Sequence, residues 1–155
     1  MRISNVSRPV RRLIYVSSFS PSFPKHPADQ DDEISYIIRS SIQHNRQADI
    51  TGFLLVHHSR FLQVLEGRPD AVMDTYARIA ADPRHCGAKI LTADDCDSRR
   101  FANWNMCARR TSATDDGILQ TLDLGGAFDP DALGGGAALA LLLAVRNIQL
   151  RETAG

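Results

Sequence analysis

The apolar residues of the chain form short runs between polar and proline-rich segments. The first run, residues 13–17, is β-branched and aromatic and stops before a loop with three prolines, which predicts a strand. The runs 49–57 and 61–66 are separated by three polar residues, a pattern typical of a hairpin. Residues 89–93 and the alternating segment 101–108 are predicted as the fourth and fifth strands.

Two segments carry apolar residues at helical spacing. In the first, isoleucines recur from Ile34 to Ile42 after an acidic start at residues 29–33. In the second, an apolar stripe follows Pro69 and ends at Pro83. The order βαββαββ predicts an α+β, ferredoxin-like fold, in which a five-stranded mixed sheet carries both helices on one face.

The central hairpin is apolar on both faces, as strands are when both sides are covered. We expect a C-terminal helix over residues 137–150 to cover the far face, after a hinge of three glycines at 134–136. The same helix could bind a partner or form a dimer. Its predicted apolar residues are Leu139, Leu142, Leu143, Ile148 and Leu150. The predicted regions are an N-terminal arm (1–12), a central domain (13–108) and a helical extension (109–155).

Composition and charge limit the classes of function. Hydrophobic residues make up 43% and charged residues 23%, which is typical of a globular domain. Because 18 basic and 18 acidic side chains cancel, we expect no direct binding of nucleic acid. Three cysteines without a CxxC pair predict neither a disulfide framework nor a metal site. The chain has no apolar run of the length that a secretory signal or a membrane span needs, so we expect a cytoplasmic protein without membrane contact.

Three polar side chains fall at apolar positions. Gln63 shares a strand face with Phe61 and Leu65, Asn45 lies on the apolar stripe of the first helix, and Tyr15 lies within the first strand. An unpaired buried amide costs about 1–3 kcal/mol, so each needs a partner. Singly, each is typical of a core or network residue. Together, groups that donate and accept hydrogen bonds suit a planar heteroaromatic ring held between the two helices.

Several stretches of the chain, in this order, resemble the motifs of the BLUF domains, a family of blue-light sensors that bind flavin. The stretches are LIYVS at 13–17, HNR at 44–46 with ITGFLL at 50–55, FLQVLEG at 61–67, DPRH at 82–85 and RFANWNM at 100–106. The resemblance covers residues 13–106. The loop at 19–32 is longer and richer in proline than in the family pattern.

The resemblance implies a non-covalent flavin between the helices, FAD in the first place, with FMN or riboflavin as alternatives. It implies that Tyr15 and Gln63 are the photoactive pair, that Asn45 holds the pyrimidine end of the ring, and that Trp104 and Met106 relay the signal. The further cofactor contacts that it implies are Ile37, Ile38, His44, Leu54, Arg78, Ile79, Asp82, Arg84 and His85.

The mechanism implied by the resemblance is light-driven transfer of an electron and then a proton from Tyr15, with rotation or tautomerisation of the Gln63 amide. No substrate is turned over, so the chain is not expected to be an enzyme. The residues after Met106 are too few for a usual output domain, which predicts a separate effector protein, and we also expect a homo-oligomer. The alternatives are a small flavin-dependent redox enzyme and a cofactor-free protein-interaction module.

Overall fold

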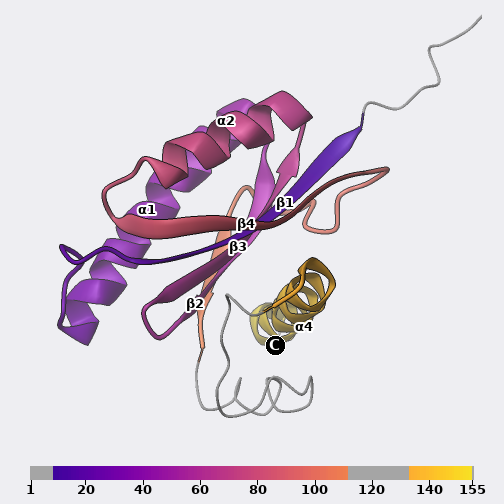
Figure 1. The fold of residues 1–155 in the computed structure, drawn as a ribbon. Coiled ribbons are helices and arrows are strands. Elements are labelled where there is room, and N and C mark those ends of the chain that lie inside the picture. The colour runs from indigo at the N-terminus through magenta and orange to yellow at the C-terminus, as the bar shows by residue number, and fades with distance from the viewer. Residues whose placement is uncertain (1–8, 112–132, 155) are drawn as a thin grey trace, which may run out of the picture.

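The computed structural model describes residues 9–111 and 133–154 and shows one sheet between two layers of helix (Figure 1). The elements are β1 (Val10–Phe19), α1 (Pro27–Ala48), β2 (Thr51–His57), β3 (Arg60–Gly67), α2 (Pro69–Ala80), β4 (His85–Cys96), β5 (Cys107–Arg110) and α4 (Gly135–Ala154). The sheet has the order β4-β1-β3-β2-β5, in which β5 pairs parallel with β2 and all other pairs are antiparallel. The predicted ferredoxin-like α+β fold is confirmed.

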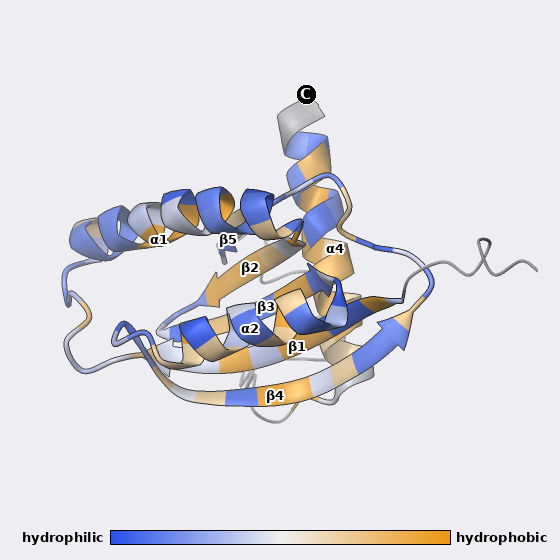
Figure 2. Ribbon diagram, turned by 90° about the horizontal axis from the view of Figure 1, so that it is seen from above, coloured by the Kyte–Doolittle hydropathy of each residue, from blue (hydrophilic) through white to orange (hydrophobic). Residues whose placement is uncertain are grey.

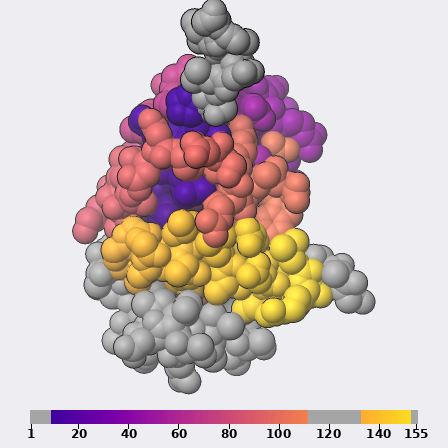
Figure 3. Space-filling model, turned by 90° about the vertical axis from the view of Figure 1, so that its right-hand side faces the viewer, coloured from indigo at the N-terminus to yellow at the C-terminus, as the bar shows by residue number. Residues whose placement is uncertain are grey.

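The alternation of side chains along the strands divides the interior into two cores. Leu13 and Tyr15 of β1 face α1 and α2, whereas Ile14 and Val16 face α4. Figure 2 shows apolar residues concentrated along the central strands and α4, and Figure 3 shows α4 as a yellow band along one side of the molecule. The C-terminal helix thus covers the far face of the sheet, as expected.

The contact face of α4 differs from the predicted one. The helix begins at Gly135, and the Ala138 amide donates to the Gly134 carbonyl, so two of the three glycines are helical and do not form a hinge. The residues of α4 buried against the sheet are Ala138, Leu141, Leu142, Val145 and Ile148. Of the five predicted residues, Leu142 and Ile148 are buried, Leu139 and Leu143 are half-buried, and Leu150 is 44% exposed. The apolar residues of α4 are spread around its circumference, so the sequence pattern does not indicate which side of the helix is buried.

The predicted fifth strand is present, but its predicted bounds of 101–108 are wrong, because the strand spans Cys107–Arg110. The backbone before it is bound elsewhere: the amides of Arg100 and Phe101 donate to the Glu66 carboxylate at 2.9 and 2.7 Å. The Trp104 carbonyl accepts from the Gly52 amide at 2.9 Å. These bonds fix a loop in the place where alternation alone indicated a strand.

Four other boundaries differ from the sequence prediction. Helix α1 begins at Pro27, with the His26 side chain accepting from the Ala28 amide, so the proline-rich loop ends earlier than expected. Asp49 has a φ of 55° and ends α1, so β2 starts two residues later than predicted. Strand β4 is longer than predicted and begins at His85. Strand β1 begins at Val10, inside the predicted N-terminal arm.

Cys86, Cys96 and Cys107 are free thiols. Among residues 9–111 and 133–154, no group of three or more His, Cys, Asp or Glu side chains is placed to hold a metal ion. Within those same residues, no helix has the length and apolar character that crossing a bilayer requires.

Candidate functional site

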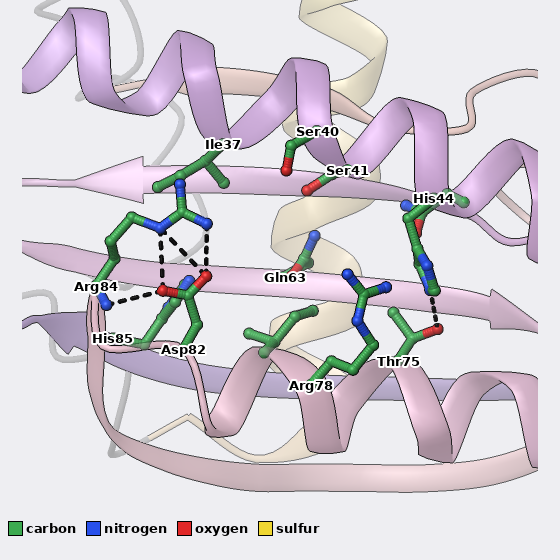
Figure 4. A pocket seen from close by; sticks show the side chains of 12 residues that line it. Ile37, Ser40, Ser41, His44, Gln63, Thr75, Arg78, Asp82, Arg84 and His85 are labelled. Carbon is green, nitrogen blue, oxygen red and sulfur yellow. Dashed lines mark hydrogen bonds and ion pairs between the residues drawn. The ribbon is translucent and has the colours of Figure 1, made fainter.

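A groove lies between α1 and α2, above the central strands of the sheet (Figure 4). The space between its walls measures about 490 Å³, part of which is open solvent. The lining residues are Ile37, Ser40, Ser41, His44, Asn45, Gln63, Thr75, Arg78, Ile79, Asp82, Arg84 and His85.

The floor of the groove is a buried hydrogen-bonded chain. Tyr15 pairs with Gln63 across β1 and β3, and its hydroxyl donates to Gln63 Oε1. Gln63 Nε2 donates to the sulfur of Met106 at 3.2 Å. All three side chains are buried, and burial raises the pKa of the Tyr15 phenol, so this hydroxyl stays protonated.

At one end of the groove, Asn45 is held from below. Its Nδ2 donates to the Asn105 carbonyl at 2.7 Å, and Asn105 Nδ2 donates in turn to the Ile50 carbonyl at 3.2 Å. Asn45 is 2% exposed, and no partner of its Oδ1 lies in the part of the chain that the structure describes. This end therefore offers a buried acceptor beside an anchored donor.

His44 lies one residue before Asn45 and contacts the opposite helix. Its Nε2 lies 3.2 Å from Thr75 Oγ1, and that hydroxyl donates to the Ala71 carbonyl at 2.7 Å. Because the Thr75 proton is already used, Nε2 of His44 must carry the hydrogen. Partial burial and the nearby Arg78 charge lower the pKa of His44, which favours this neutral form.

The other end of the groove is charged. Arg84 binds the Asp82 carboxylate through two nitrogens at 2.6 and 3.0 Å, which lowers the pKa of Asp82. His85 Nδ1 lies 2.9 Å from the buried Ser17 hydroxyl, and burial lowers the pKa of His85 to about 4. The guanidinium of Arg78 also lines the groove and has no ion-pair partner among the described residues.

The structure brings most of the predicted site residues to this groove and places a few behind it. Tyr15 lies beneath Gln63, whereas Ile38 and Leu54 pack in the core under α1 and α2 without lining the groove. Met106 is buried against Gln63, and Trp104 packs on Phe53 with ring centroids 5.5 Å apart.

Sequence reasoning missed three hydroxyls of the lining: Ser40, Ser41 and Thr75. The two serines stand three and four residues after Ile37, on the side of α1 that faces the groove. Helical spacing from Ile37 and His44 is the signal that would have found the two serines.

The residues present fit a flavin. The free Oδ1 of Asn45 is an acceptor, and the Gln63 amide donates only to a thioether, which is a weak acceptor, so both can bind the alternating donors and acceptors of a heteroaromatic edge. Ile37 of α1 and Ile79 of α2 stand on opposite walls and suit the two faces of a flat ring. Fold and groove together define a ferredoxin-like domain with a groove between its helices that suits a planar ligand.

Residues 10–107 match the family model of BLUF, described as sensors of blue-light using FAD. The chain therefore belongs to the BLUF family, which confirms the resemblance drawn from its motifs.

Known proteins similar to the chain include both large and small ones. The photoactivated adenylate cyclase subunit beta of Euglena longa is 30% identical over 104 residues, 66% of this chain and 12% of the relative. The blue light- and temperature-regulated antirepressor BluF of Escherichia coli (strain K12) is 34% identical over 102 residues, 62% of this chain and 25% of the relative. The dark-state structure of BlrB, a BLUF protein, is 27% identical, covers 88% of this chain and 94% of BlrB, and has a TM-score of 0.68. The matched part of the chain thus spans a small fraction of the two longer relatives.

Proposed function

We propose that the chain is a blue-light photoreceptor that binds FAD non-covalently in the groove between α1 and α2 and signals to a separate protein. The observation that carries this proposal is the buried chain Tyr15–Gln63–Met106 at the floor of the groove, in a member of a blue-light sensor family. It connects the ligand site directly to the loop before β5.

The bound flavin would supply absorption of blue light and an electron acceptor in its excited state. Asn45 and Gln63 would bind the polar edge of the ring, and Ile37 and Ile79 would exclude water from its two faces. Arg78 would attract the phosphate groups of the cofactor, since its charge is not used in an ion pair among the described residues.

Tyr15 is suited to give up an electron before a proton. Burial disfavours the phenolate, so the proton cannot leave while the side chain keeps all its electrons. Once oxidised, a phenol becomes strongly acidic, and its proton can pass along the hydrogen bond to Gln63 Oε1 and through that amide to the bound flavin, which would accept both the electron and the proton. Return of the electron and the proton restores Tyr15, so the cycle consumes no substrate and the protein acts as a sensor, not an enzyme.

Gln63 is the switch in this proposal. Rotation of its amide by half a turn places Nε2 toward Tyr15 and Oε1 toward Met106; tautomerisation would also exchange donor and acceptor. A thioether accepts hydrogen bonds but donates none, so the contact at 3.2 Å between Gln63 and Met106 is lost in the rotated state. The change in Gln63 is thereby coupled to the position of Met106.

Met106 can pass this change to the other face of the sheet. It directly precedes β5 and follows Trp104, whose carbonyl binds Gly52 and whose ring packs on Phe53 in the core under α4. Arg146 of α4 donates to the Arg100 carbonyl in the same loop. We infer that Trp104 and Met106 relay the signal to the C-terminal extension and from there to an effector protein.

Purification in the dark, followed by visible spectra before and after blue light, tests the proposal against its alternatives. A yellow protein with a small, reversible red shift supports the sensor. A colourless protein would contradict it and favour a cofactor-free interaction module, and bleaching only after addition of a substrate would favour a flavin-dependent redox enzyme. The homo-oligomer and the cytoplasmic location stay predictions.

A further inference from the structure

The charged end of the groove leads to an exposed aromatic side chain on α1. Tyr36 is 55% exposed, the most exposed large hydrophobic side chain among residues 9–111 and 133–154. Its ring lies under the guanidinium of Arg84, with 5.4 Å between Arg84 Cζ and the ring centroid. Tyr36 stands one turn before Ser40 and two turns before His44, so it continues the side of α1 that lines the groove.

The guanidinium above Tyr36 has a fixed position. Arg84 binds the Asp82 carboxylate through two nitrogens, and its NH1 lies 3.8 Å from Glu33 Oε1. Planar guanidinium groups and aromatic rings both stack on flat π systems. An anchored arginine beside an exposed tyrosine therefore forms a flat, partly solvated surface at the mouth of the groove.

We propose that Tyr36 and Arg84 form a subsite for the adenine ring of FAD and make the protein select FAD over FMN. This proposal rests on the proposed function and names which flavin the groove takes. A purine offers a face that aromatic side chains and arginine bind by stacking. FMN and riboflavin carry the same isoalloxazine ring but no purine, so they gain nothing from this surface.

The separation of the two ends of the groove suits a long ligand. Tyr36 lies nine residues before Asn45 on α1, about 13 Å along the helix axis at the usual rise per residue. A ligand held at Asn45 must extend well past its ring system before it meets Tyr36. Arg78, on the opposite helix, supplies a positive charge between these ends for phosphate, a group that FMN and FAD share.

Equilibrium titration of dark apoprotein with FAD, FMN and riboflavin, followed by quenching of flavin fluorescence, tests the subsite. We expect the wild-type protein to bind FAD about 5- to 30-fold more tightly than FMN, the lower part of the range that base stacking supplies. Tyr36→Ala should lower the FAD affinity to that of FMN and leave FMN and riboflavin unchanged, whereas Tyr36→Phe should keep the preference. Alanine is a good helix former at this exposed position, and circular dichroism checks that α1 persists.

Two further variants separate the subsite from the rest of the groove. Asn45→Ala should weaken all three flavins by the same factor, and Arg78→Ala should weaken FAD and FMN but not riboflavin. An unchanged ratio of FAD to FMN affinity in Tyr36→Ala, or equal weakening of all three ligands, would overturn the adenine subsite while the proposed flavin site stands. Failure of the wild-type protein to bind any flavin would overturn both proposals.

Discussion

Gln63 lies between the hydroxyl of Tyr15, which donates a hydrogen bond to its amide, and the thioether of Met106, which accepts one from it. Tyr15 donates, so it requires the oxygen of Gln63, and the sulfur of Met106 accepts, so it requires the nitrogen. One orientation of the amide therefore satisfies both contacts. Rotation of the amide by half a turn would lose the contact to Met106, so in the proposed cycle this residue is the point where a change in the groove becomes a change in the protein.

Gln63→Leu should keep the flavin bound and abolish the red-shifted state, because leucine fills a similar volume but can neither donate nor accept a hydrogen bond. Visible spectra before and after blue light measure the effect. Gln149→Leu, the same substitution in α4, is the matched control and should retain the shift. A red shift of wild-type size in Gln63→Leu would show that this amide is not the switch.

Tyr15→Phe should retain the fold and the flavin and lose the normal photocycle. The ring still packs against Tyr76, 5.3 Å away between centroids, but the hydroxyl that donates to Gln63 is gone. Tyr76→Phe removes a half-buried hydroxyl from the other ring of this pair and serves as the control. The yield of red-shifted protein per absorbed photon is the measurement, and equal yields in wild type and Tyr15→Phe would exclude Tyr15 as the donor.

His85 should make the stability of the protein depend on pH. Its pKa is about 4 in the folded protein because the ring is buried, against about 6.5 in an unfolded chain. As the pH falls from about 6.5 toward 4, the unfolded chain binds a proton that the folded protein does not, so the free energy of unfolding decreases, by on the order of 3 kcal/mol in total.

Denaturant unfolding of wild type and His85→Gln between pH 7.5 and 4 measures this contribution of His85. The wild-type protein should lose more stability than the variant over this range, and above pH 7 the difference between the two should be constant. Parallel pH profiles of the two proteins would show that His85 is not held neutral.

At the scale of elements, the loop from β4 to β5 is tied to β3 by one buried carboxylate. Glu66 is fully buried, accepts from the amides of Arg100 and Phe101 and pairs with Arg12 at 2.7 Å. Arg99 of the same loop donates to the Asp49 carbonyl at 2.8 Å. The base of the loop that carries Trp104 and Met106 is thus held by these hydrogen bonds and this ion pair.

Glu66→Gln should lower the free energy of unfolding by about 2 kcal/mol, since charge-assisted hydrogen bonds become neutral ones and Arg12 loses its counter-ion. Urea unfolding measures the change. Asp95→Asn removes the charge of a solvent-exposed carboxylate that pairs with the neighbouring Arg11 and should leave stability unchanged. Equal effects of the two substitutions would show that the Glu66 contacts do not stabilise the loop.

The elements that the sequence predicted well are those with a strong local pattern. The hairpin of β2 and β3 and the stripe of α2 depend on spacing alone, whereas the residues before β5 depend on Glu66, more than 30 positions away. The residues of the candidate site also divide into those that a sequence motif marks and those that no motif marks. Motif positions such as Asn45 lie at the groove. The Thr75 hydroxyl of α2 also lines the groove but lies outside every motif of the resemblance, and only its helical spacing from Arg78 and Ile79 indicates its place.

At the scale of the whole molecule, one sheet carries the ligand groove on one face and α4 on the other. Strand β5 connects the two sides: Arg110 pairs with Asp31 of α1, and Arg109 pairs with Glu152 of α4 at 2.8 Å. Adjacent residues of a strand point to opposite faces, which explains why neighbouring arginines bind different layers. A displacement at the start of β5 therefore acts on both layers.

Leu141→Ala should destabilise the entire protein by about 2–4 kcal/mol, because this fully buried residue of α4 packs in the core that contains Ile14 and Phe53. Leu150→Ala, at an exposed position of the same helix, should cost less than about 1 kcal/mol. Thermal unfolding followed at two wavelengths should show one transition in both variants. A separate early transition in Leu141→Ala would show that α4 unfolds independently of the sheet.

In the proposed function, light absorbed in the groove switches the protein reversibly without a substrate. The light-minus-dark absorption difference spectrum of the dark-purified protein measures this switch. We predict a flavin spectrum that shifts to longer wavelength under blue light, returns in the dark and repeats over many cycles with no substrate added. A protein without flavin, or a spectrum that bleaches once and does not recover, would show that the protein is not a reversible blue-light sensor.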